Sequence, residues 1–156
     1  MMGSAVEVRQ ATVWDLDLLT PLFDAYRLFY REASDPERAR QFLLERFRHN
    51  QSIVFLALDG SAAVGFTQLY PSFSSTAMAR IFVLNDLFVD PKWRGRGVGS
   101  ALLETAAEYG RRLGAIRLSL RTEASNLRAQ ALYEELGWKR NSIFHAYDLD
   151  LSRPGQ

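Results

Sequence analysis

Cysteine is absent from the 156-residue sequence. The chain therefore has no disulfide bond, no thiolate metal site and no cysteine nucleophile. Histidine is scarce, and the spacing of His49 and His145 does not suggest a metal site. We expect no bound metal.

A large excess of charge of one sign is also lacking, because 19 basic residues face 18 acidic ones. Bulk charge gives no reason to expect a nucleic-acid partner. No apolar run reaches the ~20 residues that a membrane-spanning helix needs. The N-terminal segment MMGSAVEVRQAT has no apolar core of an export signal. We therefore expect a cytoplasmic protein with no nucleic-acid or membrane partner.

The length favours a single domain over residues 1–156 with a core of its own. Hydrophobic periodicity and turn residues predict the order β-αα-βββ-α-β-α-ββ, an α/β fold with a mixed central sheet. The first helix begins after Thr12, and Pro21 predicts a kink or break in it. The remaining elements are a helix from Pro36, strands at 53–58, 63–70 and 81–89, a loop at 71–75, a helix at about 98–113, a strand at 116–122, a helix from Asn126, and strands at 138–139 and 143–151.

The stretch from Ile81 to Leu103 combines a buried strand, a glycine-rich turn and the start of a helix. Proline at 91 ends the strand, because it cannot continue the ladder. Glycines let the backbone approach a ligand, and the free N–H groups at a helix start point toward it. Lys92, Arg94 and Arg96 add positive charge. The pattern predicts a site for a phosphorylated ligand.

The glycine spacing excludes two common phosphate loops. The dinucleotide fingerprint G-x-G-x-x-G fails because Ser100 occupies its last position. The P-loop fails because no Lys-Ser or Lys-Thr follows the glycines. What remains is R-x-x-G-x-G after a strand that ends in Leu87-Phe88-Val89.

This motif resembles the acetyl-CoA pyrophosphate loop of the GCN5-related N-acetyltransferases, the GNAT superfamily. A second segment, Asn126 to Trp138, is similar to the family pattern N-x-x-A-x-x-x-Y-[EK]-x-x-G-[FW]. The resemblance covers nearly the whole chain and implies acetyl-CoA as co-substrate. The residues that it assigns to this cofactor are Leu87, Phe88, Val89, Arg94, Gly95, Arg96, Gly97, Val98, Gly99, Ser100, Asn126, Ala129 and Tyr133.

The polar pair Asn85 and Asp86 interrupts the buried strand and predicts a β-bulge or an opening toward a cleft. In the resembled family a bulge here splays two strands, and the acyl arm lies between them. Asn85 stands where some polyamine acetyltransferases of the family carry Glu, which argues against a polyamine acceptor. An ordinary bond from Asp86 to a loop backbone is the alternative.

The resemblance implies that Tyr133 protonates the leaving thiolate as general acid. A base must deprotonate the amine, and the candidates are Asp86, Glu123 and Tyr30. Tyr30 and Phe73, with Asn85, belong to segments that cover the acceptor side in this family. Packing of the aromatic residues in the core is the alternative.

The predicted activity is transfer of the acetyl group of acetyl-CoA to a primary amine of a small molecule in a ternary complex. A homodimer could complete the acceptor pocket. Three alternatives remain at this point. In the first, the enzyme acetylates a lysine or the N-terminus of a protein. In the second, the chain is a non-catalytic module that binds acyl-CoA, and in the third it binds nucleotides through the Arg94–Gly99 loop alone.

Overall fold

The computed structural model of the chain describes residues 6–152. They fall into two compact units that divide between Arg121 and Thr122, and each is described by itself. The first unit holds a five-stranded sheet in the order β1-β2-β3-β4-β5, in which β5 runs parallel to β4 and the other neighbours are antiparallel. The α/β class with a mixed sheet is therefore confirmed. The prediction of one domain over the whole chain stays a prediction.

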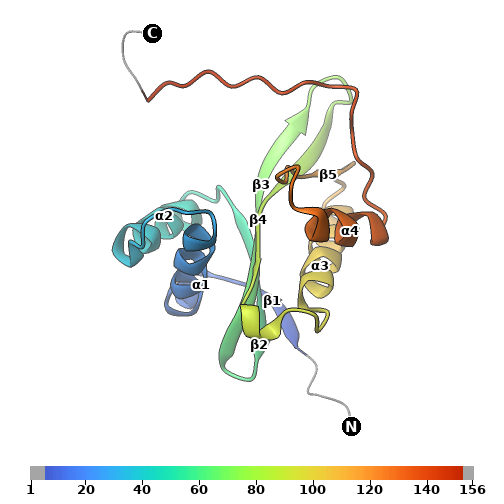
Figure 1. Cartoon of the computed structure of the whole chain (residues 1–156). Coiled ribbons are helices and arrows are strands. Elements are labelled where there is room, and N and C mark those ends of the chain that lie inside the picture. Colours follow the sequence, from blue (N-terminus) through green and yellow to red (C-terminus); the bar gives the residue numbers. More distant parts are fainter. Residues whose placement is uncertain (1–5, 153–156) are drawn as a thin grey trace. The chain divides into compact units, whose positions relative to one another are not determined.

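The elements of the first unit alternate much as their sequence patterns predict (Figure 1). They are β1 (Glu7–Gln10), the 3₁₀ helix η1 (Val13–Asp15), α1 (Leu16–Phe29), α2 (Pro36–Arg48), β2 (Ile53–Asp59), β3 (Ala62–Ser74), β4 (Ala79–Val89), the 3₁₀ helix η2 (Pro91–Trp93), α3 (Val98–Arg112) and β5 (Leu118–Ser119).

The first two helices begin where their capping residues predict. The Thr12 side chain accepts from the Trp14 N–H, and the Asp15 carboxylate accepts from the Thr12 N–H at 2.8 Å, which makes a reciprocal cap. At the start of α2 the Asp35 carboxylate accepts from the Arg38 N–H at 3.1 Å, a one-sided cap. The break predicted near Leu19 and Thr20 is wrong, because α1 continues through Pro21, and the alternative of a kink there stays a prediction. The buried apolar side of α1 stabilises the helix despite the hydrogen bond that proline cannot make.

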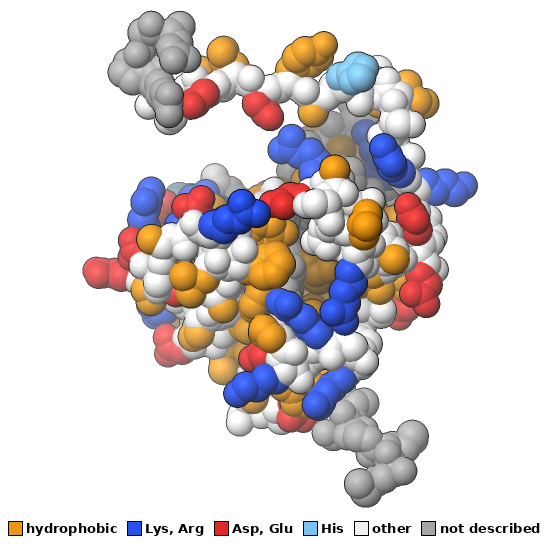
Figure 2. Space-filling model, viewed as in Figure 1, with side chains coloured by type: hydrophobic (Ala, Val, Ile, Leu, Met, Phe, Trp, Pro, Cys, Tyr) orange, Lys and Arg blue, Asp and Glu red, His pale blue; other side chains and the backbone are white. Residues whose placement is uncertain are grey.

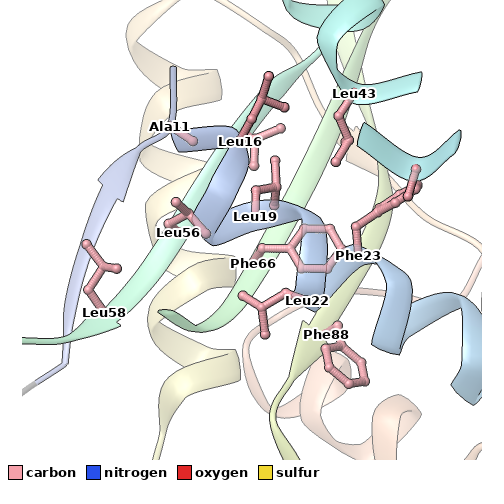
Figure 3. Close-up of a cluster of buried hydrophobic side chains, with 12 residues drawn as sticks. Ala11, Leu16, Leu19, Leu22, Phe23, Leu43, Leu56, Leu58, Phe66 and Phe88 are labelled. Carbon is pink, nitrogen blue, oxygen red and sulfur yellow. The ribbon is translucent and has the colours of Figure 1, made fainter. Parts of the chain in front are cut away.

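A hydrophobic core fills the space between the sheet and the two N-terminal helices. Figure 1 shows α1 and α2 on one face of the sheet and α3 on the other. Leu16, Leu19 and Phe23 of α1 and Leu43 of α2 lie against Phe66 in the sheet (Figure 3). Each such side chain contributes roughly 1.5–3 kcal/mol by its burial. This core fixes α1 against β3 and β4, with α2 packed on α1.

On the opposite face, Gly65 in β3 lets α3 lie close to the sheet. A Cβ at this position would be 3.0 Å from the Phe88 carbonyl oxygen, 3.2 Å from a Val98 methyl and 3.3 Å from a Leu102 methyl. Because Gly65 has no side chain, the start of α3 can pack directly against the sheet beside the end of β4.

The predicted loop at 71–75 is wrong, because β3 continues to Ser74 and pairs there with Ala79 of β4. Pro71 lies within this extension. Its position is tolerated because β2 pairs with β3 only as far as Leu69, so that one side of β3 is an edge at Pro71.

The second unit contains α4 (Leu127–Glu135), which begins after Asn126 as predicted. The two strands predicted at 138–139 and 143–151 are wrong: up to Ser152, the last described residue, this segment forms no strand. Alternation predicts the faces of a strand but supplies no partner for its backbone, and the apolar side chains here are exposed. They are Ile143, Phe144, Tyr147, Leu149 and Leu151.

The Gly65→Ala variant should lose roughly 1–3 kcal/mol of unfolding free energy, because the new methyl group meets a backbone carbonyl that cannot move alone. Urea unfolding of the two proteins measures this difference. Ser61→Ala, at an exposed turn position, is the control and should stay within about 0.5 kcal/mol of the wild type. Equal stability of Gly65→Ala and wild type would contradict the close approach.

Candidate functional site

The loop between β4 and α3 is held by backbone bonds at its start and turned by glycines at its end. The Asp90 N–H donates to the Val64 carbonyl at 2.8 Å, and the Asp90 carboxylate accepts from the Lys92 N–H at 2.9 Å. Gly95 and Gly97 have φ values of 76° and 82°. This left-handed conformation favours glycine, so both positions depend on that residue.

The start of α3 presents backbone donors at the end of this loop. The Ala101 N–H donates to the Gly97 carbonyl at 3.0 Å, as the first bond of the helix. The N–H groups of Val98, Gly99 and Ser100 therefore have no carbonyl partner within α3. The cations of the loop itself are Lys92, Arg94 and Arg96, and Figure 2 shows Lys and Arg side chains exposed on this face. Donors, helix dipole and cations at one place favour the binding of an anion.

Arg94, one of the predicted phosphate ligands, is bound to the protein itself. Its Nε donates to the Val89 carbonyl at 3.0 Å. Its guanidinium carbon lies 5.4 Å from the ring centre of Phe29 and 5.6 Å from that of Phe88. Arg96 lies over the Trp93 ring at 4.7 Å. Both cations are thus oriented by aromatic rings, and Arg94 connects the loop to the end of α1.

The predicted bulge is present in β4. Gln68 pairs with Asp86 and Leu69 pairs with Leu84, which leaves Asn85 as the extra residue. Beyond the bulge, β4 has an open edge. Its pairing with β5 covers only Phe82 and Val83. Among the described residues, no strand therefore pairs with Leu84–Val89 on that side of β4.

The carbonyl direction at the end of β4 follows from one hydrogen bond. Because the Asp90 N–H points to β3, the Val89 carbonyl of the same peptide points the other way, toward the open edge. The Val89 carbonyl accepts there from Arg94 Nε. Leu87, two residues earlier, has its backbone groups on the same open side, where an extended ligand could bind as in strand addition.

Asp86 is a buried carboxyl group, only 3% exposed. Gln68 Nε2 and Asn85 Nδ2 donate to its two oxygens, the second at 3.0 Å. Burial raises the pKa of Asp86, while the hydrogen bonds from Gln68, Tyr26 and Asn85 act in the opposite direction. Gln68 is itself fully buried, and its Oε1 has no hydrogen-bond partner in the described residues. The carboxylate of Asp86 and the free Oε1 of Gln68 can therefore accept hydrogen bonds from a bound donor group.

Two tyrosines lie beside this carboxyl group. The Tyr26 hydroxyl donates to the Asn85 carbonyl at 3.4 Å, and burial together with the charge of Asp86 raises the pKa of Tyr26 well above its ordinary value. Burial and Asp86 also raise the pKa of Tyr70, to about 12. Both phenols therefore stay protonated at neutral pH.

The structure brings together Asn85, Asp86 and the aromatic end of α1, where Tyr30 contacts Tyr26 with ring centres 5.1 Å apart. It does not bring Phe73 to this cluster. Phe73 is 71% exposed, pairs with Arg80 near the tip of the hairpin, and by strand alternation lies on the face of β3 opposite to Gln68.

Four predicted site residues lie in the second unit. Asn126 Oδ1 accepts from the Ala129 N–H at 3.2 Å, so this side chain caps α4. Tyr133 lies one turn after Ala129, and its ring centre is 5.9 Å from that of Trp138. Glu123 is exposed, and its carbonyl accepts from the Asn126 N–H and the Gln130 side chain.

Sequence reasoning missed Gln68 and Thr67, which complete the surroundings of Asp86. The Thr67 hydroxyl donates to the Asp86 carbonyl at 2.8 Å, and both residues are fully buried. The signal was present: Thr-Gln interrupts the apolar run of β3 as Asn-Asp interrupts that of β4. In the described residues no group of His, Cys, Asp and Glu is arranged to hold a metal ion, and no helix has the length and apolarity to cross a membrane.

Comparisons with known proteins agree on the family. The sequence profile described as "Acetyltransferase (GNAT) family" matches residues 19–138. The uncharacterized N-acetyltransferase YhfO of Bacillus subtilis is 43% identical over 146 residues, which cover 94% of this chain and 98% of YhfO. A crystal structure of a probable acetyltransferase has a TM-score of 0.89 and 40% identity, covering 94% of this chain and 99% of the other.

The name of a more distant relative includes its acceptor. The aminoglycoside N(6')-acetyltransferase type 1 of Stenotrophomonas maltophilia is 30% identical over 146 residues, which cover 89% of this chain and 90% of that protein.

The raised pKa of Asp86 predicts a pH-dependent stability. The folded protein binds the Asp86 proton more tightly than the unfolded chain does, so this group stabilises the fold at low pH and the contribution is lost as pH rises through the folded pKa. The unfolding free energy of wild type relative to Asp86→Asn should fall as pH rises above ~4.

Urea unfolding of both proteins between pH 4 and pH 8 measures this difference. Asp148→Asn, at an exposed position, is the matched control. If the difference between wild type and Asp86→Asn were constant over this range, burial would not perturb the titration of Asp86.

Proposed function

Because the chain belongs to the acetyltransferase (GNAT) family, we propose that it transfers the acetyl group of acetyl-CoA to a primary amine of a small molecule, by direct attack in a ternary complex. The protein is an acetyl-CoA-dependent N-acetyltransferase, with acetyl-CoA as its co-substrate. The acceptor, the mechanism and the roles of single residues are the proposed part.

The observation that carries the proposal is the junction of the anion site with the open edge of β4. The loop from Arg94 to Ser100 offers backbone donors to a pyrophosphate group, and Leu87 together with the Val89 N–H at the open edge offers backbone groups to the amides of a pantetheine arm. Both features belong to one continuous segment of the first unit. This supports CoA as the ligand over a nucleotide that uses the loop alone.

The chemistry requires a neutral amine nitrogen. Its lone pair attacks the thioester carbonyl carbon to form a tetrahedral intermediate whose nitrogen then loses one proton. The carbonyl re-forms as the carbon–sulfur bond breaks, and the CoA thiolate takes a proton. Backbone donors of the central strand stabilise the oxyanion. Tyr133 donates the proton to the thiolate in this proposal, and the products are the acetylated amine and free CoA.

Asp86 is our choice of general base. An alkylamine has a pKa near ~10 and reaches the site as an ammonium ion. A carboxyl group whose pKa is raised by burial is a stronger base than an exposed one, and Asp86 lies at the bulge where the acyl arm would end. Glu123 is exposed in the second unit. Tyr30 contacts Tyr26, and it is Tyr26 that hydrogen-bonds to Asn85 at the bulge. Asp86 therefore fits the role better.

A small-molecule acceptor is supported by the name of the Stenotrophomonas relative, which acts on an aminoglycoside. The aromatic side chains of Tyr26, Tyr30 and Tyr70 beside a carboxyl group suit a cationic amine. An assay of CoA thiol release with a panel of amines and with a lysine peptide tests the acceptor class. Faster release with the peptide than with every small amine would favour protein acetylation.

A homodimer remains part of the proposal. The exposed apolar residues of segment 143–151 support it, because such side chains are commonly covered by a partner. Sedimentation equilibrium measures the oligomeric state, and a monomer at micromolar concentration would contradict it.

Replacing Gly97 by Val should abolish CoA binding. Gly97 has a φ of 82°, which a β-branched residue does not adopt without strain, and the side chain would stand at the helix start. Calorimetry with CoA measures the affinity. Gly60→Val is the matched control, since Gly60 also has a positive φ, of 59°, but lies in the β2–β3 turn. Unchanged CoA affinity in a folded Gly97→Val protein would contradict the loop assignment.

Tyr133→Phe removes one hydroxyl group and keeps the ring. If Tyr133 is the general acid, turnover should fall by ~10²–10⁴-fold while CoA affinity changes little. Steady-state thiol release and CoA calorimetry give the two quantities. Wild-type turnover in this variant would mean that the thiolate finds its proton elsewhere.

A further inference from the structure

Gln68 is a fully buried amide directly opposite Asp86. The two residues are partners in the register of β3 and β4, and the side chain of Gln68 has no exposed surface. Its Nε2 donates to Asp86 Oδ2, whereas its Oε1 has no hydrogen-bond partner in the described residues. In this part of the chain, the hydrogen bond to the carboxyl group is therefore the one that the amide makes.

Packing alone does not explain a glutamine at this position. Burying an amide with an unsatisfied acceptor costs free energy, and an apolar side chain of similar volume would avoid that cost. Phe66, two residues earlier on the same face of β3, is such an apolar residue and packs in the core under α1 (Figure 3). The bond to Asp86 is what an amide provides here and an apolar residue does not.

The two oxygens of the Asp86 carboxyl group have different surroundings. Oδ2 accepts from the buried Gln68, and Oδ1 accepts at 3.0 Å from the side chain of Asn85, which is an exposed residue. The backbone of Asp86 is held as well, because the Thr67 hydroxyl donates to its carbonyl at 2.8 Å. The carboxyl group is thus held from the interior at Oδ2, and Oδ1 lies on the side of Asn85.

A neutral donor suits a carboxylate that acts as a base. A lysine or arginine in place of Gln68 would form an ion pair and hold the pKa of Asp86 low, which would make a weak base. The hydrogen bond from Gln68 also lowers the pKa of Asp86, but burial has the larger influence and raises it. The amide can therefore orient the carboxylate and leave it basic.

The other groups around Asp86 do not titrate in the acidic range. Tyr26 of α1 and Tyr70 of β3 interact with Asp86, and the raised pKa of each phenol keeps it protonated there. Tyr30 acts on Tyr26, and Arg46 of α2 acts on Tyr70 and keeps its charge throughout. A proton lost from this cluster in the acidic range therefore comes from Asp86.

We propose that Gln68 is the positioning residue for Asp86, because it binds Oδ2 and thereby presents Oδ1 to the amine on the side of Asn85. This inference rests on the proposed role of Asp86 as general base. In that step an N–H bond of the ammonium ion breaks, its electron pair stays on nitrogen, and an O–H bond forms at Oδ1. Asp86 returns the proton to water after the products leave. Gln68 touches neither the substrate nor the reacting atoms.

The test measures kcat/KM against pH, by thiol release with an amine of the panel, for wild type and Gln68→Met. Methionine keeps the approximate volume and removes the donor. The acid limb of the profile reports the pKa of Asp86 in the free enzyme. Because the bond from Gln68 lowers this pKa, its loss should move the limb to higher pH by ~1–2 units. On the plateau, kcat should fall ~10-fold because the carboxylate is less well oriented.

Thr67→Val is the matched control. It also removes a buried hydrogen bond to Asp86, but one to the backbone carbonyl and not to the carboxyl group. The midpoint of its acid limb should therefore stay at the wild-type value. CoA calorimetry and urea unfolding show whether each variant is folded and keeps its CoA affinity.

Gln68→Glu replaces Gln68→Met if the methionine variant does not fold. Glutamate has the shape of glutamine, and its carboxyl group would lie against that of Asp86. Two adjacent carboxyl groups do not both ionise readily, so the acid limb should again move to higher pH.

Two outcomes overturn the inference alone: an acid limb that substitution of Gln68 leaves in place, or one that Thr67→Val moves as far. Asp86→Asn should lose the limb. If it instead keeps the wild-type limb and turnover, Asp86 is not the base, and the inference fails with that assignment. Absence of thiol release with every amine of the panel would overturn the proposed acetyl transfer.

Discussion

The insertion of one residue in β4 is the constraint on which the site depends. Asn85 has no partner on β3, whereas Leu84 and Asp86 on either side are paired. Asp86 and Phe88 share the face of the sheet under α1 by ordinary alternation, and the extra residue offsets this alternation from that of Ile81–Leu84; β4 is paired with β5 only before this point. If the register of Leu84 with Leu69 were kept, a strand without the bulge would place the carboxyl group on the other face. A single insertion thus determines where the buried acid and the open edge lie.

The polar cluster at the bulge is stable only because the rest of the unit is well packed. Burying Asp86 and Gln68 costs free energy that their mutual hydrogen bond only partly offsets, and Gln68 Oε1 has no partner in the described residues. The apolar core under α1 and α2 supplies the opposing stabilisation. Local conflict of this kind, within otherwise consistent packing, is typical of functional sites.

The sequence allowed prediction of features that depend on local chemistry. Caps at Thr12 and Asp35, the turn at Gly95 and Gly97, and the bulge at Asn85 each follow from residues close together in the chain. Features that depend on a partner elsewhere were not predictable. The role of Gln68 requires the register of β3 and β4, and the tolerance of Pro71 requires knowing where β2 stops. The strand predicted at 143–151 was wrong for the same reason, since alternation specifies no partner.

Arg94 limits the conformational freedom of the loop that we propose as the pyrophosphate site. Its Nε bond to the Val89 carbonyl and its contacts with Phe29 and Phe88 tie the loop to the body of the first unit. Arg96 on Trp93 restrains the next turn in a similar way. Much of the conformational entropy of this segment is therefore lost during folding and not on association. A preorganised loop of this kind gains affinity without any additional contact to the ligand.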